Sequence, residues 1–233
     1  MSVKKLCLAA SAVALVFSGS LCLNGKACAE SAPSSDINKL LYYYRQDASV
    51  QQLLFVNALR GSSAHIMFYE KDPDSGAWTI TRECKGITGK AGAGKTKEGD
   101  NKTPLGIFSV RTAFGIKADP GTKLPYVHVS DDTYACGCEL YYNQIIDARE
   151  TGHVCPYGEH MTEYSPHYNY GLAIDYNPDN VPGLGSAIFI HCIGAKPWTG
   201  GCVAMPESDM KYVLEHCGPG VKVIIQQYIP SED

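Results

Sequence analysis

The residues best suited to covalent chemistry are a histidine and a cysteine near the C-terminal end of the sequence, His191 and Cys202. His191 follows the apolar run 187–190, and Cys202 precedes the apolar run 203–205. Short apolar runs are typical of buried strands, so the two side chains can face each other at one end of a sheet. A nucleophilic thiolate and the base that takes its proton require this arrangement.

The residues just before Cys202 suit the binding of a reacting carbonyl group. They are Thr199, Gly200 and Gly201, and the two glycines let the backbone approach a substrate closely. The N–H groups of Gly201 and Cys202 are predicted to form an oxyanion hole. We therefore expect Thr199, Gly200 and Gly201 to position the substrate.

His191 needs a hydrogen-bond acceptor that orients its ring. Because no acidic residue lies near it in the sequence, a backbone carbonyl is expected to accept from its second nitrogen, that of Gly194 or Thr199. A free thiol has a pKa of about 8.5, and an imidazole within hydrogen-bond reach lowers that value. The alternatives are a structural histidine and a disulfide-bonded Cys202.

The N-terminal 29 residues have the pattern of a secretory signal. Lys4 and Lys5 precede the apolar run 6–17, and the small-residue site 27–29 follows. The run is short for a membrane span, although an uncleaved anchor is an alternative. The segment holds three of the 20 basic residues and no acidic one, so 17 basic and 24 acidic residues remain. This balance argues against a nucleic-acid partner, and export places the protein in the cell envelope, in the cell wall or periplasm.

Cysteines are unusually frequent in the part of the chain after the signal. An odd number in an exported protein leaves at least one thiol unpaired, while the disulfide connectivity stays open. Cys192 is expected to point away from the His191 face and to pack or form a disulfide. No metal or other cofactor is expected, because the spacing Cys136-x-Cys138 is not a usual zinc pattern. The seven cysteines are Cys84, Cys136, Cys138, Cys155, Cys192, Cys202 and Cys217.

The periodicity of the chain predicts a mainly β fold, a sandwich or mixed sheet with a few peripheral helices. We expect an N-terminal helix and lead-in over 30–63 and a catalytic domain over 64–229. The segment 131–182 is predicted to be long and irregular, with tyrosines that form binding walls or anchor the loop. Helices are expected at 34–46 and 206–217, strands at 64–70, 77–84, 107–110, 126–130, 171–176, 187–191 and 221–227, a loop at 111–125, and a strand or helix at 50–59.

A glycine-rich stretch, 89–96, matches the spacing of a nucleotide-binding phosphate loop. Such a loop must open a helix whose N-terminus binds the anion. Gly99 and Pro104 break any helix after Lys95, so no nucleotide is expected.

Two signatures together resemble those of the YkuD-type L,D-transpeptidases. The first is Thr103-Pro104-x-Gly106-x-Phe108, and the second is His191 followed by the stretch 199–205. The resemblance covers roughly residues 64–227 and implies a β-sandwich with Cys202 as nucleophile and His191 as base. Many relatives have arginine where this chain has Ala204, so the sequence fits a branch with Gly-Cys-Val-Ala.

The resemblance implies acyl transfer on peptidoglycan stem peptides, which forms 3–3 cross-links or attaches other amines through a Cys202 thioester. One alternative is a hydrolase on the same scaffold, an L,D-carboxypeptidase or a cross-link-cleaving peptidase. Another is a non-catalytic wall-binding protein with several disulfides. Thr103, Gly106 and His160 are possible cleft-lining residues, and any membrane contact is expected only through an uncleaved signal.

Overall fold

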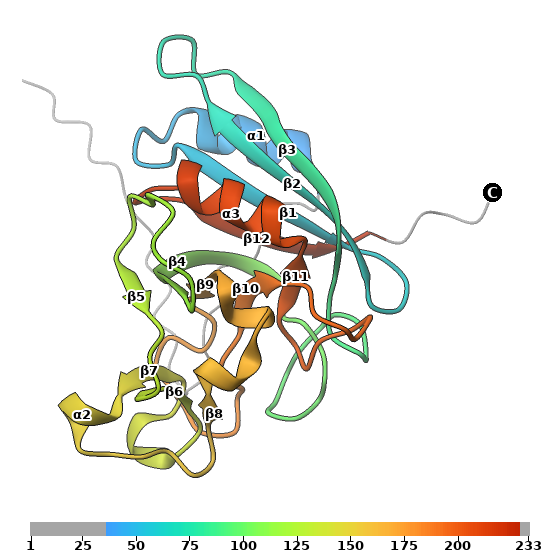
Figure 1. Ribbon diagram of the computed structural model, residues 1–233. Coiled ribbons are helices and arrows are strands. Elements are labelled where there is room, and N and C mark those ends of the chain that lie inside the picture. The colour runs from blue at the N-terminus through green and yellow to red at the C-terminus, as the bar shows by residue number, and fades with distance from the viewer. Residues whose placement is uncertain (1–35, 229–233) are drawn as a thin grey trace, which may run out of the picture. The chain divides into compact units, whose positions relative to one another are not determined.

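The computed structural model describes residues 36–228, and its centre is a barrel of β-strands (Figure 1). One nine-stranded sheet runs in the order β12-β1-β2-β3-β11-β10-β9-β4-β5. Because β12 pairs with both β1 and β4, the sheet closes on itself, and β5 extends it beyond β4. The strands are β1 (Gln52–Ala58), β2 (Ser63–Lys71), β3 (Trp78–Ile87), β4 (Gly106–Gly115), β5 (Tyr126–His128), β9 (Gly171–Ile174), β10 (Phe189–Cys192), β11 (Val203–Met205) and β12 (Lys222–Gln227).

The predicted mainly β fold with few helices is confirmed, and the mixed sheet takes the form of a closed barrel. Closure depends on β4, whose first half pairs with β12 and whose second half pairs with β9. The register shifts between Val110 and Thr112, where the strand changes partner. The prediction of a loop over 111–125 is therefore wrong at its start, because pairing with β9 continues the strand. The adjacent residues Ala113 and Phe114 are both fully buried, so the segment lacks the alternation of a half-buried strand.

The ambiguous segment 50–59 is the strand β1. Leu53 and Leu54 are both fully buried, although they point to opposite faces of the sheet. Leu53 packs with the helix α1 (Ile37–Arg45), whereas Leu54 belongs to the main core. A strand buried on both faces reads as an unbroken apolar run, so its period alone does not distinguish strand from helix. The side chain of Asp36 caps α1 by accepting the N–H of Asn38.

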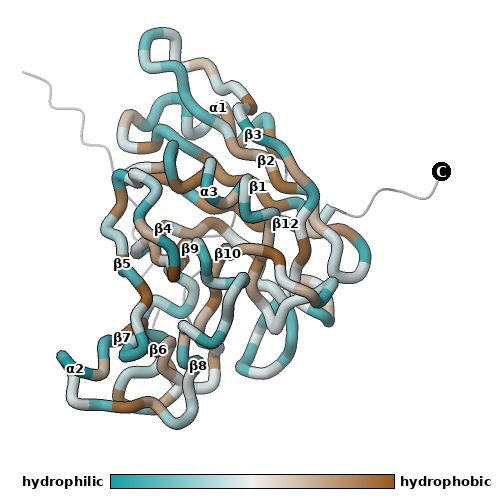
Figure 2. Tube along the Cα trace, in the orientation of Figure 1, coloured by the Kyte–Doolittle hydropathy of each residue, from teal (hydrophilic) through white to brown (hydrophobic). Residues whose placement is uncertain are grey.

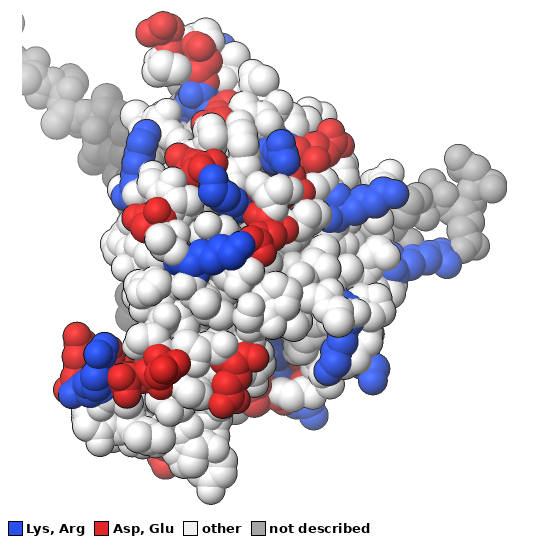
Figure 3. All heavy atoms as spheres, in the orientation of Figure 1, with Lys and Arg blue, Asp and Glu red and all other residues white. Residues whose placement is uncertain are grey.

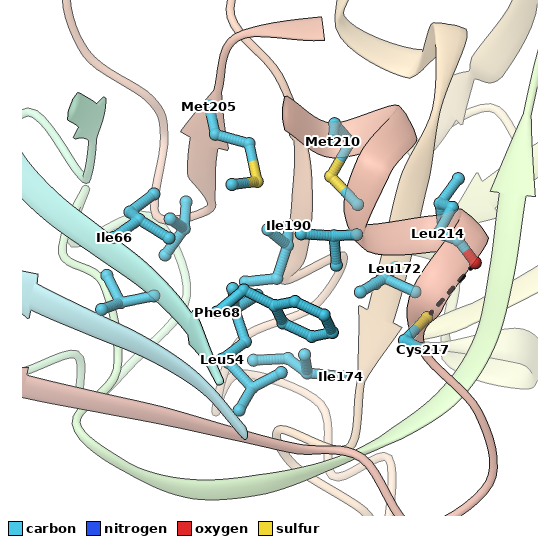
Figure 4. Close-up of a cluster of buried hydrophobic side chains, with 14 of the residues drawn as sticks. Leu54, Ile66, Phe68, Leu172, Ile174, Ile190, Met205, Met210, Leu214 and Cys217 are labelled. Atoms are coloured by element: carbon cyan, nitrogen blue, oxygen red, sulfur yellow. Dashed lines mark hydrogen bonds between the residues drawn. The ribbon is translucent and has the colours of Figure 1, made fainter. Parts of the chain in front are cut away.

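The main hydrophobic core joins the barrel strands to the helix α3 (Glu207–His216) (Figure 4). Met210 and Leu214 of α3 are fully buried against Phe68 of β2 and Ile190 of β10. Burial of each such side chain contributes about 1.5–3 kcal/mol. Apolar residues follow the barrel strands, while the connecting loops are largely polar (Figure 2). This core therefore fixes β10 and β11, the strands beside His191 and Cys202.

A second, smaller sheet lies within the segment 131–182 (Figure 1). Its strands are in the order β7-β6-β8. The prediction of an irregular segment is therefore wrong for these residues, because strands this short pair only locally and leave little periodic signal. The strands of this sheet and the short helices around it are β6 (Thr133–Cys136), η1 (Glu139–Tyr141), β7 (Gln144–Asp147), α2 (Ala148–Thr151), β8 (Glu159–His160), η2 (Met161–Tyr164) and η3 (His167–Asn169).

The barrel begins at β1, before the predicted domain boundary at residue 64, since β1 pairs with both β2 and β12. The predicted signal over residues 1–29 lies outside the described residues. Between residues 36 and 228, no helix is long and apolar enough to cross a membrane. On the face drawn in Figure 3, basic and acidic side chains are interspersed.

Candidate active site

A cavity of about 650 Å³ lies where the barrel meets the small sheet. The barrel side contributes His191 and Cys202, and the small sheet and its loops contribute Glu159 and Tyr157. The residues predicted to react therefore share one cavity with residues from a region that the sequence left unassigned.

Backbone bonds hold Cys202 at the start of β11. Its carbonyl accepts hydrogen bonds from two buried hydroxyls, Thr199 Oγ1 at 2.6 Å and Thr103 Oγ1 at 3.2 Å. Thr103 Oγ1 in turn accepts the N–H of Gly89 at 2.8 Å. The signature that contains Thr103 is thereby connected directly to the cysteine.

The Cys202 sulfur is held close to β10. Its Sγ donates to the carbonyl of Ala187 at 3.1 Å and accepts the N–H of Phe189 at 3.3 Å. Burial and, to a lesser extent, the nearby Glu159 carboxylate raise the pKa of the Cys202 thiol to about 12. Cys202 is therefore a protonated thiol at neutral pH.

His191 is buried and electrically neutral at neutral pH. Burial lowers the pKa of its imidazole to about 4. Its Nδ1 lies 2.8 Å from the carbonyl of Cys192, which fixes the proton on Nδ1 and leaves Nε2 as the basic nitrogen. The orienting group is a backbone carbonyl, as expected, but it belongs to Cys192 instead of Gly194 or Thr199.

The imidazole of His191 is enclosed by aromatic rings. The ring centroid of Tyr168 lies 5.6 Å from it, and that of His167 lies 5.9 Å away. Among the described residues, no hydrogen bond joins His191 to Cys202. The parallel pairing of β10 with β11 places His191 opposite Ala204, so Cys202 lies beside Phe189, one step along the cavity wall. A rotation of the thiol is needed to bring it to Nε2.

The predicted site residues divide into two groups. Thr199, Gly200 and Gly201 line the cavity with the cysteine and histidine. Thr103, Gly106 and His160 lie outside the cavity lining. Thr103 acts on the Cys202 backbone, Gly106 adopts a φ of +145° next to the ring of Phe108, and His160 stacks on Tyr134.

The predicted oxyanion hole has only one of its two N–H groups available in this geometry. The Gly201 N–H donates to Thr199 Oγ1 at 3.1 Å, so the Cys202 N–H is the donor left for an oxyanion. Gly201 has a φ of +149°, and a Cβ there would lie 3.0 Å from the carbonyl of Lys102. A glycine is required at this position on both grounds.

Sequence reasoning missed the carboxylate–tyrosine pair beside Cys202. The Tyr168 hydroxyl donates to Glu159 Oε2, and the ring of Tyr168 packs on both Phe189 and His191. Burial raises the pKa of Glu159 and of Tyr168. The tyrosine-rich composition of the segment was a signal for a binding wall, but it did not single out Tyr168.

The glycine-rich stretch 89–96, which matches the spacing of a phosphate loop, has a different role in the structure. The Lys95 ammonium is buried and forms an ion pair with Asp100 at 3.0 Å. Lys95 lines the cavity and favours the Cys202 thiolate electrostatically. Ala204, which replaces the arginine of many relatives, is fully buried and brings no charge. The positive charges of the cavity wall come from Lys95 and Lys196.

The cysteines outside the cavity also separate into groups. Cys192 is fully buried in the main core, and its Sγ lies 3.5 Å from the carbonyl of Tyr170, so it packs on the face away from His191, as predicted. Cys136 and Cys155 form a disulfide, and Cys138 lies next to them. Cys84 and Cys217 are free thiols.

The comparisons with known proteins point to one family. The model of the L,D-transpeptidase catalytic domain, YkuD, matches residues 38–225. No curated protein gives a significant match. Two solved structures are similar at 17% identity: the Ldtfm–avibactam carbamoyl enzyme and a cysteine-to-serine mutant of the Enterococcus faecium L,D-transpeptidase.

Both structural matches have a TM-score of 0.38 and cover 74% of this chain. They cover 48% and 49% of the other chains, so this chain spans about half the length of those proteins. The family model covers most of the sequence and includes both signatures and the whole cavity. The chain therefore belongs to the YkuD family of L,D-transpeptidase catalytic domains, whose chemistry acts on peptidoglycan.

Proposed function

We propose that this protein is an exported acyltransferase that acts on peptidoglycan stem peptides through a thioester at Cys202. The observation that carries the proposal is the shared cavity, in which a protonated cysteine adjoins a neutral, oriented histidine. A histidine with a pKa of about 4 is a free base at neutral pH. The thiol must lose a proton to react, and His191 Nε2 is the group placed to take it.

In the first step, Cys202 Sγ transfers its proton to His191 and attacks the carbonyl that precedes the terminal D-alanine of a stem tetrapeptide. The oxyanion accepts the N–H of Cys202. Collapse breaks the amide bond, and the proton on His191 moves to the departing D-alanine amine. The products are a thioester and free D-alanine.

In the second step, the amine of another stem attacks the thioester. His191 takes a proton from the attacking nitrogen and returns one to the sulfur, so the thiol is regenerated and a new amide bond forms. Glu98 and Glu159 place two carboxyl groups on the cavity wall. Tyr142 and Ser186 donate hydrogen bonds to Glu98 at 2.5 and 2.8 Å, which holds this carboxylate in place for an ammonium group.

The same cavity has features that suit an anionic donor stem. The Lys196 ammonium lies 4.9 Å from the ring centroid of Trp198, and both residues line the cavity. A cation over an aromatic ring is held in place at low cost. Lys196 is thus positioned to bind the carboxylates of the donor.

The test is incubation of the protein with disaccharide tetrapeptides, with the products followed by mass spectrometry. We expect a cross-linked dimer and release of D-alanine, and Cys202→Ala should abolish both. Cys84→Ala, which removes a half-buried thiol outside the cavity, is the matched control and should keep activity.

Other outcomes would contradict the proposal. Release of D-alanine without a dimer would assign a hydrolase. No turnover by the wild type, or undiminished turnover by Cys202→Ala, would remove the catalytic assignment. A carbapenem adduct located at Cys202 would exclude the non-catalytic, wall-binding alternative.

A further inference from the structure

Four potential metal ligands meet at one end of the small sheet, outside the active-site cavity. They are the sulfurs of Cys136, Cys138 and Cys155 and a ring nitrogen of His153. All four ligand atoms lie within 4.8 Å of one another. Two X-x-X pairs supply them, Cys136-x-Cys138 at the end of β6 and His153-x-Cys155 in the loop after α2.

Two glycines allow these two segments to approach each other. A Cβ at Gly137 would lie 2.2 Å from the carbonyl of Tyr157, and a Cβ at Gly158 would lie 2.5 Å from the carbonyl of Ala135. Real Cβ atoms do not tolerate such distances, so the close approach of the two segments depends on glycine at both positions. The close packing of the two backbone segments therefore brings the sulfurs together.

The disulfide between Cys136 and Cys155 accounts for only part of this arrangement. Cys138 Sγ lies 3.0 Å from Cys155 Sγ and remains a thiol. His153 Nε2 is buried, and among the described residues nothing forms a hydrogen bond with it. A buried polar atom without a partner destabilises the fold, so an unmet ligand is the simplest physical reason for the position of this nitrogen.

We propose that Cys136, Cys138, His153 and Cys155 form a structural zinc site when all three cysteines are reduced. Three thiolates and one imidazole are a donor set typical of structural Zn²⁺. A tetrahedron with bonds of about 2.3 Å has edges of about 3.8 Å, so four ligand atoms that lie within 4.8 Å of one another need only small shifts to hold the ion once the disulfide is reduced. With four protein ligands the site is closed, so it serves structure and not catalysis.

Binding of Zn²⁺ to the reduced site exchanges protons for the metal ion and changes no oxidation state. One Zn²⁺ replaces the protons of three thiols, which pass to water, and the neutral imidazole donates its Nε2 lone pair. The Cys138 N–H already points at Cys136 Sγ at 3.4 Å, as a backbone donor to a thiolate does. The zinc form and the disulfide form use the same sulfurs and exclude each other.

The site lies next to the wall of the active-site cavity. Gly137, Tyr157 and Gly158 line that cavity, and each lies within three residues of a proposed ligand. Zinc would tie the end of β6 to the segment 152–158 and so hold this wall in place. Its loss should loosen the small sheet while the barrel stays folded.

The experiment measures metal in the full-length protein after mild reduction, with no chelator present. We expect one zinc per chain by elemental analysis, and Co²⁺ substitution should give thiolate-to-cobalt charge-transfer bands and strong tetrahedral d–d bands. Cys138→Ser should lower zinc content at least tenfold although it leaves both disulfide partners intact. His153→Ala should do the same, whereas Cys84→Ala should bind zinc like the wild type.

Hydrogen exchange gives a readout that does not depend on activity. A chelator should speed exchange in residues 133–160 and leave β1, β2 and β12 unchanged. The proposal is overturned if the purified protein carries the Cys136–Cys155 disulfide and takes up no Zn²⁺ or Co²⁺ after mild reduction. Zinc content that is equal in the wild type and in Cys138→Ser would overturn it as well.

Discussion

The barrel and the small sheet are stabilised in different ways. The barrel buries a continuous apolar core that reaches from β1 to α3. The small sheet has a core cluster of its own with only Cys136, Ile146 and Cys155, and it packs on the barrel through a second apolar cluster, in which Ala135 and Met161 join Phe114 and Phe189. The proposed reacting pair lies on the barrel, and much of the wall around the substrate lies on the small sheet. The rigid region thus positions the chemistry, and the region with little core shapes recognition.

The largest effect that distinguishes the two regions is expected from His191→Gln. Removal of the base should lower acylation of Cys202 by about 10²–10⁴-fold, because the thiol, with a pKa of about 12, stays protonated without it. Single-turnover acylation by a carbapenem measures this step. His160→Gln, a histidine of the small sheet outside the cavity lining, is the matched control and should leave the rate unchanged. Equal losses in both variants would mean that the two regions do not divide these roles.

The pH dependence of the free energy of unfolding should also arise from a residue of the barrel, His191. The folded pKa of His191 is about 4, below the ordinary histidine value of about 6.5, so between these values the unfolded chain binds more protons than the folded chain. The free energy of unfolding should be fully retained above pH 6.5 and fall as the pH drops towards 4, by about 3 kcal/mol from this residue. Urea unfolding at several pH values measures it. A pH slope in His191→Gln that equals that of the wild type would contradict the assignment.

The hydrogen bond between Tyr168 and Glu159, on the side of the small sheet that packs against the barrel strand β10, should have an intermediate effect. Tyr168→Phe removes the donor to the partly buried Glu159 carboxyl and should cost about 1–3 kcal/mol of unfolding free energy. The double variant Tyr168→Phe, Glu159→Leu should recover most of that stability, because neither partner is then left unsatisfied. Thermal unfolding measures both variants. Tyr164→Phe, whose ring stacks on Tyr168 at 5.3 Å, controls for loss of a nearby hydroxyl.

The smallest effect is expected from Glu98→Gln. Loss of this carboxylate should raise the KM for the acceptor amine about 2–5-fold, since an exposed charge pair contributes under about 1 kcal/mol. Acylation by the donor should not change. Steady-state kinetics with varied acceptor separates the two, and Glu163→Gln, an exposed acid of the small sheet outside the cavity lining, is the control. An equal effect on acylation would argue against an acceptor site at Glu98.

The mainly β class, most of the barrel strands and the choice of His191 and Cys202 follow from the amino-acid sequence. Each of these depends on local information: an apolar period, a glycine pair, or residues adjacent in the chain. Cys192 was likewise predicted to face away from His191 because neighbouring residues of a strand alternate between its faces. The two signatures added the family.

Other features of the barrel and of the site depend on contacts that form only in the folded chain. Closure of the barrel through β4, the pairing of Glu159 with Tyr168, and the bond from His191 to the Cys192 carbonyl depend on contacts that no local pattern encodes. The three sulfurs and one nitrogen of the proposed zinc site show most plainly that local sequence patterns do not encode such contacts. Their spacing along the chain argued against a metal, whereas folding of the small sheet brings them within 4.8 Å of one another. A metal site requires proximity in space, and two short pairs of ligands on separate loops become one site only after the strands between them have paired.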